Sequence, residues 1–237
     1  MQVCLLRVGI DTGSGGMLGP LLRDGSFEYV PIPEDLSEHG RKYGEIHGKK
    51  DNRLLSEFFS TKRQARIRDT LAHLDPEFDS YTYGDPTRPK RSLRELEQGD
   101  LLVFYAGLEP HGFEDSTKRG LYVIGYFEVE AAGEAVRFAK DRLSELFGKN
   151  QHVKYPRKNE AELVLVKGST KSRLLRHAHL ISKNGRDRSG NRIYVLSDDA
   201  KSHFGTFTKL NAIQRSIPRW VSSDMAEKAA EWVRQLD

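Results

Sequence analysis

The chain has 237 residues and a formal net charge of +4, from 38 Lys and Arg against 34 Asp and Glu. Hydrophobic residues make up 37% of it and aromatic residues 9%, which favours a folded protein with a sizeable core over an intrinsically disordered one. The single cysteine, Cys4, excludes a disulfide framework and a cysteine-rich zinc site. No apolar stretch reaches the roughly 18 residues of a membrane span. We expect one domain over residues 1–237, without a signal peptide or a membrane partner, in a reducing cytoplasm.

Apolar runs bounded by turn residues predict the strands, which we place at residues 2–10, 27–30, 101–107, 121–130, 163–166 and 192–196. The fourth of them should bend at Gly125, because a glycine inside a strand commonly marks a bulge. Apolar residues at helical spacing predict helices at 134–147, 172–180 and 225–236, the last one capped by Ser223 or Asp224. Residues 92–96 predict a helical turn, and residues 54–59 fit either a short helix or an extended segment. These elements predict an α+β fold with a mixed, strongly twisted or barrel-like sheet and peripheral helices.

A glycine-rich loop, Asp11-Thr12-Gly13-Ser14-Gly15-Gly16, follows the first predicted strand. Glycine allows close approach of the backbone to a ligand, and backbone amides in such loops bind anions. Asp11 and the hydroxyls of Thr12 and Ser14 are therefore candidates to bind a phosphate or a sugar, and Asp11 is also a candidate base or nucleophile. The loop is neither GxGxxG nor a P-loop, and no lysine follows the paired glycines, which disfavours an NTPase. The structural alternative is a tight turn that closes on the sheet.

His73 and Asp75 form a second candidate, since two residues apart in an extended segment they would share a face. A histidine titrates near neutral pH and suits general acid–base catalysis. The open alternatives are a metal site with Glu77, and a turn in which Asp75 caps the backbone. His177 and His179 lack a third ligand at a suitable spacing. We assign no metal ligands, and the sequence requires no particular cofactor.

Basic residues gather in three stretches, at 49–68, 88–94 and 167–192. Three such clusters favour a polyanionic partner such as nucleic acid, although each alone fits a solvated surface. The candidates for contacts with a nucleic-acid backbone are Lys62, Arg63, Arg66, Lys171, Arg173 and Arg176. Among the aromatic residues that could stack a base we place Tyr105 with the glycine loop in a nucleotide site, the alternative being a place in the core.

The string from Arg7 to Gly16, followed by Pro31-Ile32-Pro33, His73-Leu74-Asp75-Pro76 and the segment from Gly99 to Gly107, resembles the nucleotide modification associated domain family of the third type. The resemblance covers roughly residues 1–130, which leaves residues 131–237 to complete the core and the basic surface. It departs from the family where Met17-Leu18-Gly19-Pro20 stands in place of an expected Cys-Pro-Ser-Pro. The strands from Gly99 and Tyr122 also resemble the strand pair of PUA, ASCH and EVE-type barrels, which commonly hold a nucleotide or a flipped, modified base.

The resemblance implies recognition or processing of a modified base or nucleotide in DNA, in DNA modification or in defence against phages. For an enzyme, Asp11, His73 and Asp75 are the predicted catalytic residues, with hydrolysis at a glycosidic bond or a base substituent as the reaction. The loop from Thr12 to Gly16 and Tyr105 would then bind the nucleotide. The alternatives are a binding module without catalysis and a structural partner of other proteins in a defence complex.

Overall fold

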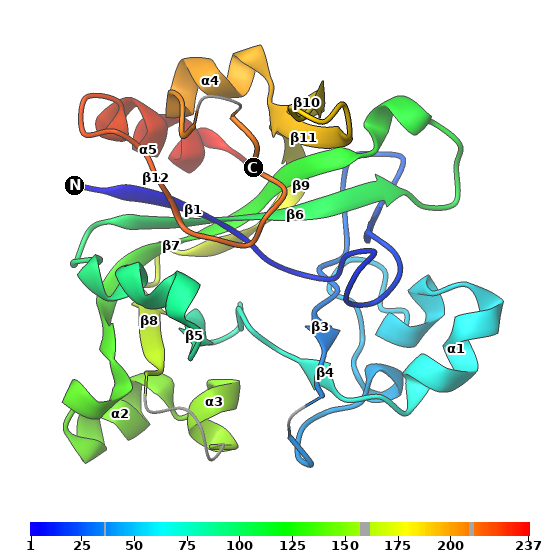
Figure 1. The fold of residues 1–237 in the computed structure, drawn as a ribbon. Coiled ribbons are helices and arrows are strands. Elements are labelled where there is room, and N and C mark those ends of the chain that lie inside the picture. Colours follow the sequence, from blue (N-terminus) through cyan, green and yellow to red (C-terminus); the bar gives the residue numbers. More distant parts are fainter. Residues whose placement is uncertain (36, 157–161, 209–210) are drawn as a thin grey trace.

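The computed structural model describes residues 1–35, 37–156, 162–208 and 211–237, and its centre is one large mixed sheet (Figure 1). Strand β1 (Val3–Arg7) runs parallel to β6 (Leu101–Pro110) and antiparallel to β12 (Arg219–Trp220). The sheet continues through β7 (Gly120–Glu134) to β8 (Val164–Gly168) and β5 (Thr82–Asp85). Two further strands pair with it, β2 (Gly19–Leu21) with β6 and β9 (Arg173–Leu180) with β7.

The remaining elements surround this sheet. Two small antiparallel pairs are formed by β3 (Ile32–Pro33) with β4 (Ala72–His73) and by β10 (Ser182–Arg186) with β11 (Arg192–Leu196). The α-helices are α1 (Thr61–Arg68), α2 (Lys140–Phe147), α3 (Gln151–Lys154), α4 (Asp198–Phe204) and α5 (Ala226–Gln235). The 3₁₀-helices are η1 (Tyr43–Glu45), η2 (Leu55–Phe58), η3 (Arg88–Glu95), η4 (Ser116–Lys118) and η5 (Ala135–Arg137).

The long strand β7 gives the sheet its shape, because its two halves pair with different neighbours. Residues 120–128 pair with β6, whereas residues 129–134 pair with β8. Its pairing with β9 shifts register between Val123 and Gly125, the position at which the sequence predicts a bend. The strand order of the described residues is that of an open sheet rather than a closed barrel. The fold is α+β with a mixed sheet, as predicted.

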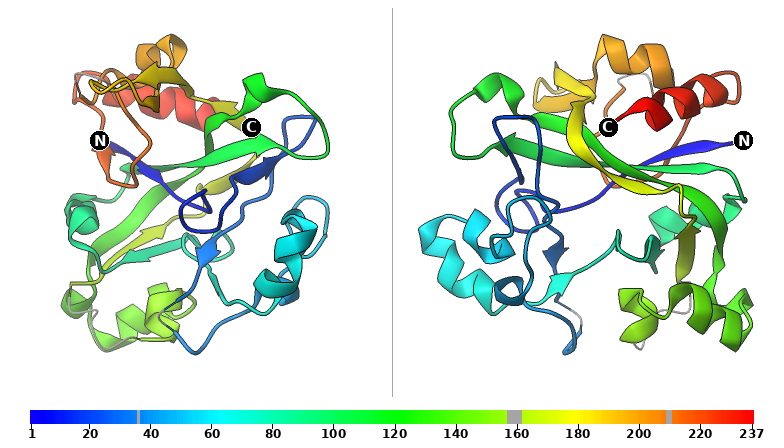
Figure 2. Two further views of the ribbon diagram at one scale, coloured as in Figure 1. Left: turned by 45° about the vertical axis from the view of Figure 1, so that its right-hand side comes forward. Right: turned by 180° about the vertical axis from the view of Figure 1, so that it is seen from behind.

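The main core lies between the sheet and the C-terminal elements. One cluster of buried apolar residues includes members from Val3 to Leu236 and is centred on β1, β6 and β7. Helix α5 packs against α4 and against β1, on the side of the sheet that also carries β10 and β11 (Figures 1 and 2). A second, smaller cluster of buried apolar residues, around Tyr43 and Phe58, stabilises the long segment between β2 and β5. No helix of the described residues is long and apolar enough to cross a membrane.

Four sequence predictions fail locally. Residues 172–180 form the strand β9 instead of a helix, because pairing with β7 overrides the helical spacing of the leucines. Residues 27–30 make a single isolated bridge, that of Phe27 with Leu21. The helix predicted from residue 134 begins at Lys140, because β7 extends to Glu134. The last helix begins after Met225, without a side-chain cap from Ser223 or Asp224. The strand at residues 192–196 was predicted with its observed bounds.

Candidate nucleotide-binding site

The glycine loop is organised by the carboxylate of Asp11. Its Oδ1 atom accepts hydrogen bonds from the backbone N–H groups of Gly13 and Ser14, each 2.8 Å long, and from the Ser14 hydroxyl at 3.1 Å. The other oxygen lies 3.5 Å from the guanidinium of Arg7, four residues earlier on β1. Partial burial opposes ionisation, but the hydrogen bonds from Ser14 and Gly13 and the charge of Arg7 lower the pKa of Asp11. Asp11 is therefore an ionised anchor of the loop at neutral pH.

Helix α1 closes the other side of the glycine loop. The guanidinium of Arg63 donates a 2.8 Å hydrogen bond to the carbonyl oxygen of Gly15. Gly16 has a φ of 74°, and the guanidinium of Arg63 occupies the space that a Cβ atom would need there. Gly16 is thus required both for its left-handed backbone and for its missing side chain. The sequence assigns Arg63 to a nucleic-acid backbone, whereas in the structure its head group binds the loop.

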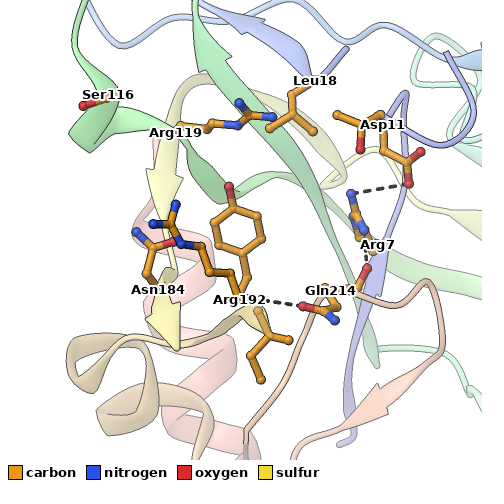
Figure 3. A pocket seen from close by; sticks show the side chains of 11 residues that line it. Arg7, Asp11, Leu18, Ser116, Arg119, Asn184, Arg192 and Gln214 are labelled. Carbon is orange, nitrogen blue, oxygen red and sulfur yellow. Dashed lines mark hydrogen bonds and ion pairs between the residues drawn. The ribbon is translucent and has the colours of Figure 1, made fainter. Parts of the chain in front are cut away.

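Arg7 and Asp11 line two neighbouring cavities. The larger cavity has a volume of about 660 Å³ and lies between the glycine loop and the β10–β11 hairpin. Figure 3 shows Arg119, Arg192 and Asn184 on one side of it and Asp11 and Arg7 on the other. The smaller cavity has a volume of about 250 Å³ and is lined by Gly9 and Ser14 in addition to Arg7 and Asp11. The glycine loop thus contributes to both polar spaces.

The larger cavity is rich in groups that recognise anions and bases. Its polar lining includes three arginines, two amides and one half-buried aromatic ring, namely Arg7, Arg119, Arg192, Asn184, Gln214 and Tyr194. Gln214 joins the walls of the cavity, because its carbonyl oxygen accepts from Arg7 and its side-chain oxygen accepts from the backbone N–H of Tyr194 at 3.1 Å. Cys4 does not line this cavity, because its thiol is buried in the core.

The smaller cavity brings Asp11 and Ser14 together with His73 and Asp75, which are 59 to 64 residues away in the sequence. The segment from β4 to β5 carries the last two residues past the glycine loop, with a cis peptide bond between Asp75 and Pro76. A short antiparallel pairing of His73 with Ile32 positions this segment. Asp11, His73 and Asp75, the three candidates for catalysis, therefore share one cavity.

His73 and Asp75 belong to a buried polar cluster that extends to α3. The Nδ1 atom of His73 lies 2.8 Å from the Oε2 atom of Glu34, whose side chain is 2% exposed. Asp75 Oδ2 accepts a 2.8 Å hydrogen bond from the backbone N–H of Gly84 and lies 3.4 Å from Nε2 of His152. The imidazole rings of His73 and His152 meet edge to face, with centroids 5.0 Å apart.

The electrostatics of Asp75 differ from those of Asp11. Its side chain is 1% exposed, and burial raises the pKa of this carboxyl against the opposing effects of His152, His73 and the amide of Gly84. Its Oδ1 atom is buried and has no hydrogen-bond partner among the described residues. A buried carboxylate oxygen without a hydrogen-bond partner destabilises the folded state, and such an atom is typical of a functional site. The pair of Asp11 and Asp75 thus offers one half-buried anion and one fully buried acid.

A comparison with known protein families shows to which family the chain belongs. The model of the family described as nucleotide modification associated domain 3 matches residues 2–176. The chain belongs to this family. The resemblance predicted from the glycine loop and the segment around His73 is thereby confirmed, and the match extends beyond residue 130.

Comparisons with individual proteins add less. No curated protein matches the chain. Among solved structures, the chain is similar to the N-terminal domain of Thermococcus gammatolerans McrB bound to m5C DNA, with 13% sequence identity and a TM-score of 0.38. This alignment covers 99% of the present chain and 98% of the McrB chain. With a TM-score this low, we infer nothing from the McrB structure about the site of this nucleotide modification associated domain.

The basic residues assigned to nucleic acid do not share one surface element in this family member. Lys62 and Arg66 are exposed on α1, and the described residues offer them no ion pair. Arg173 and Arg176 lie on β9, which is well separated from α1 in the views of Figures 1 and 2. Two residues of this set pair with acids, Lys171 with Glu128 at 3.1 Å and Arg176 with Asp237 at 3.9 Å.

Tyr105 is placed away from both cavities. It is fully buried in the core, where its hydroxyl donates a 2.8 Å hydrogen bond to the carbonyl oxygen of Ile213. No face of the ring is open to a base in this structure, so its burial gives no support to the predicted role in nucleotide binding. Of the predicted loop residues, Thr12 lines the larger cavity and Ser14 the smaller one. Glu77 caps a turn through the N–H groups of Asp79 and Ser80, outside the cluster of His73.

The sequence interpretation missed several residues of these cavities. Arg192 was recognised only as part of a basic stretch, and Arg119, Tyr194 and Gln214 come from segments without a motif. The same holds for Glu34 and His152, which reach the cluster from distant segments. The one available signal for His152 was the polar triplet Asn150-Gln151-His152 after an apolar helix, all of it buried in the structure.

Proposed function

We propose that this protein recognises a nucleotide of DNA that carries a modified base, and that the larger cavity beside the glycine loop holds it. The observation that carries the proposal is the lining of that cavity, in which three arginines, two amides and an aromatic ring surround about 660 Å³. This volume lies within the usual range of about 300–1,000 Å³ for ligand sites. Membership of a nucleotide modification associated family supports the same class of ligand.

The side chains of the cavity suit the parts of a nucleotide. Arginine binds phosphate through two parallel hydrogen bonds, which suits Arg119 and Arg192 at the exposed side of the cavity. Asn184 offers a donor and an acceptor of the kind that reads the edge of a base, and the ring of Tyr194 offers a surface for stacking. A base could reach these groups only after leaving the duplex stack, so the proposal includes an extruded nucleotide.

The exposed basic residues supply the less specific part of binding. Lys62 and Arg66 on α1 and Arg173 on β9 would contact phosphates at a distance from the base. Such contacts weaken steeply with salt, because each neutralised phosphate releases counterions. The affinity for DNA should therefore depend on ionic strength, whereas the preference for a modified base should not.

The test compares the binding of matched DNA oligonucleotides, with and without the modified bases of phage DNAs, by fluorescence anisotropy. We expect the wild type to prefer one modification, and Arg119→Gln and Arg192→Gln to weaken its binding by about tenfold each, the loss of one charge-assisted contact. Arg188→Gln serves as control, since Arg188 is exposed on the same hairpin and outside the lining. Equal affinity for modified and unmodified DNA throughout the panel would refute modified-base recognition, and equal losses in the control would refute the assigned cavity.

A second candidate function is hydrolysis of a nucleotide that reaches the smaller cavity, at its glycosidic bond or at a substituent of the base. It is favoured by the smaller cavity, where Asp11 lies with His73 and Asp75. One of these groups would take a proton from water as the water oxygen bonds to carbon, and another would protonate the leaving group. His73→Asn, which alters the lining of the smaller cavity alone, should then abolish product formation while DNA binding survives, and Asp11→Asn should abolish product formation as well. Absence of turnover on every modified DNA would leave recognition alone.

We also infer that the protein acts in the cytoplasm, in DNA modification or in defence against phages, together with partner proteins of such a system. The family membership and the three basic stretches support this context. A structural role in a larger complex makes a different prediction. In that case, the isolated chain would not bind any DNA at low salt.

A further inference from the structure

The strongest unassigned feature is the arrangement of His73, Asp75 and His152. Each offers one ligand atom, and these three atoms lie within 4.8 Å of one another. The residues come from β4, from the segment after it and from α3, so the fold brings them together from 80 residues of sequence. We propose that these three side chains bind a divalent transition-metal ion such as Zn²⁺. This inference stands apart from the proposed nucleotide binding, because a metal can be measured without DNA.

The donor set fits this class of ion. Two imidazoles with one carboxylate are a common ligand set of zinc and of other first-row divalent metals in catalytic sites, where a further position takes water or substrate. With metal–ligand bonds of about 2.0–2.1 Å, neighbouring ligands of a tetrahedral site lie roughly 3.3 Å apart. The separation of 3.4 Å between Asp75 Oδ2 and His152 Nε2 matches that spacing and is long for a hydrogen bond.

The buried carboxylate is an independent observation. Oδ1 of Asp75 has no hydrogen-bond partner among the described residues, although the side chain is 1% exposed. A carboxylate in such a place needs compensation, and the one hydrogen bond from the Gly84 amide and the 3.4 Å contact with His152 both involve Oδ2, which leaves Oδ1 uncompensated among the described residues. A divalent cation between the carboxylate and the imidazoles would supply this compensation.

The surroundings of His73 resemble a second layer of a metal site. Glu34 binds Nδ1 of His73 at 2.8 Å, which directs Nε2 of that ring toward the ion. A carboxylate behind a ligand histidine fixes the ring and raises its basicity, as in many zinc sites. Glu34 is held in turn by the side-chain amide of Gln151, at 3.4 Å. Glu34 is thus a positioning residue of the proposed site.

The site is open on one side, which distinguishes it from a structural metal centre. His73 and Asp75 line the smaller cavity, together with Asp11 and Ser14 of the glycine loop. A ligand in that cavity would have access to an open position of the ion. The competing explanation is a metal-free network, in which His73 pairs with Glu34 and His152 with Asp75.

The experiment measures Zn²⁺ binding to the full chain after removal of bound metal with a chelator, by competition with a chromophoric chelator. We expect one equivalent to bind tightly, and His73→Asn and His152→Asn each to weaken this binding at least 100-fold. Glu34→Gln should weaken it by about 10–100-fold, the usual effect of removing a carboxylate behind a ligand histidine. His177→Asn is the control, because His177 is exposed on β9.

A second readout protects the test against misfolded variants. Zn²⁺ should raise the thermal unfolding midpoint of the wild type and of His177→Asn, but not that of the His73 and His152 variants. Variants that lack a cooperative thermal transition are excluded before titration, and the two histidine substitutions test the same site independently. The proposal is overturned if the wild type does not bind Zn²⁺ tightly, or if folded His73 and His152 variants bind it as the wild type does.

Discussion

At the scale of single residues, Asp11 has two roles, one for each oxygen of its carboxylate. One oxygen holds the glycine loop, and the other faces Arg7 between the two cavities. The hydrogen bonds of Asp11 within the loop are therefore local, whereas its ion pair connects the loop to Arg7 on β1. The role of the Asp11 side chain in the loop can therefore be tested by measuring the free energy of unfolding of a variant.

Replacement of Asp11 by Ala should destabilise the protein by about 1–2 kcal/mol, because two backbone N–H groups lose a charged acceptor. The ion pair with Arg7 adds little, since the Asp11 side chain is 35% exposed and solvent screens it. The pKa of Asp11 is lowered on folding, so its contribution is complete above about pH 3.8 and is lost as pH falls through the folded value. Chemical unfolding at pH 7 and below pH 3 measures the difference. An unchanged gap between wild type and variant at both pH values would contradict this.

Replacement of Gly16 by Ala should also destabilise the loop, by about 1–3 kcal/mol. The positive φ costs about 1–2 kcal/mol for any residue with a Cβ atom, and the new methyl group displaces Arg63 from Gly15. Gly190→Ala is the matched control, because Gly190 has a φ of 82° and open space around its Cβ position. Thermal unfolding should show a larger loss for Gly16→Ala. Equal losses would mean that Arg63 does not hold the loop.

The residue scale also shows where sequence reasoning stops. The loop and the segment with His73 and Asp75 were found because each is a local motif of the family. His152 and Glu34 could not be found, because neither sits in a motif and only the tertiary fold brings them to His73. Tyr105 was misleading for the opposite reason, since an aromatic residue in an apolar strand fits a core and a pocket equally well.

At the scale of elements, the sheet depends on the bend of β7. The backbone of β9 passes so close to Gly125 that a Cβ atom there would lie 2.7 Å from the carbonyl oxygen of Arg173 and 2.9 Å from the ring of Phe78. The glycine therefore allows β9 to approach and pair with β7 at this position. The sequence predicted the bend correctly, but it could not predict which strand approaches there.

Gly125→Ala should destabilise the protein by about 1–3 kcal/mol, because a backbone carbonyl and a buried ring must move. Gly133→Ala in the same strand is the control, since its Cβ atom would meet only the ring of Phe138, at 3.4 Å. Equilibrium unfolding in urea measures both variants. Equal stability of the two would show that β9 is not held against Gly125 in solution.

The elements that were predicted well share one property. Strands β6, β7 and β11 are continuous apolar runs bounded by glycine or polar loops, and such runs depend little on distant contacts. Strand β9 lacks this signal because it is largely exposed and pairs on one side with β7 alone among the described strands. Its leucines follow a helical spacing by chance, and pairing with β7 decides its structure.

At the scale of the whole molecule, the family match and the core do not have the same extent. The match ends at residue 176, whereas buried residues of the main core continue through Ile213 and Val233 to Leu236. The backbone N–H of Val221 donates to the carbonyl oxygen of Val3, which joins the two ends of the chain at the sheet. The C-terminal part thus covers a strand that belongs to the family segment.

We therefore predict that a chain of residues 1–176 does not unfold cooperatively, whereas the full chain shows one transition. The shorter chain lacks α4 and α5, so the apolar face of β1 is exposed to water. It also lacks the second half of β9, residues 177–180. Differential scanning calorimetry and near-UV circular dichroism distinguish the two cases. A single sharp transition of the shorter chain would show that residues 177–237 form a separate unit.

The position of Arg7 between the two cavities has a thermodynamic consequence. Its guanidinium contacts Asp11 and the carbonyl oxygen of Gln214, so it links the loop at one end of the chain to a segment near the other. A ligand that draws Arg7 into one cavity changes the free energy of occupying the other. Such linkage is reciprocal, and each occupant alters the affinity of the second by the same factor. If ligands occupy both cavities, we therefore expect their affinities to be coupled through Arg7, which lines both.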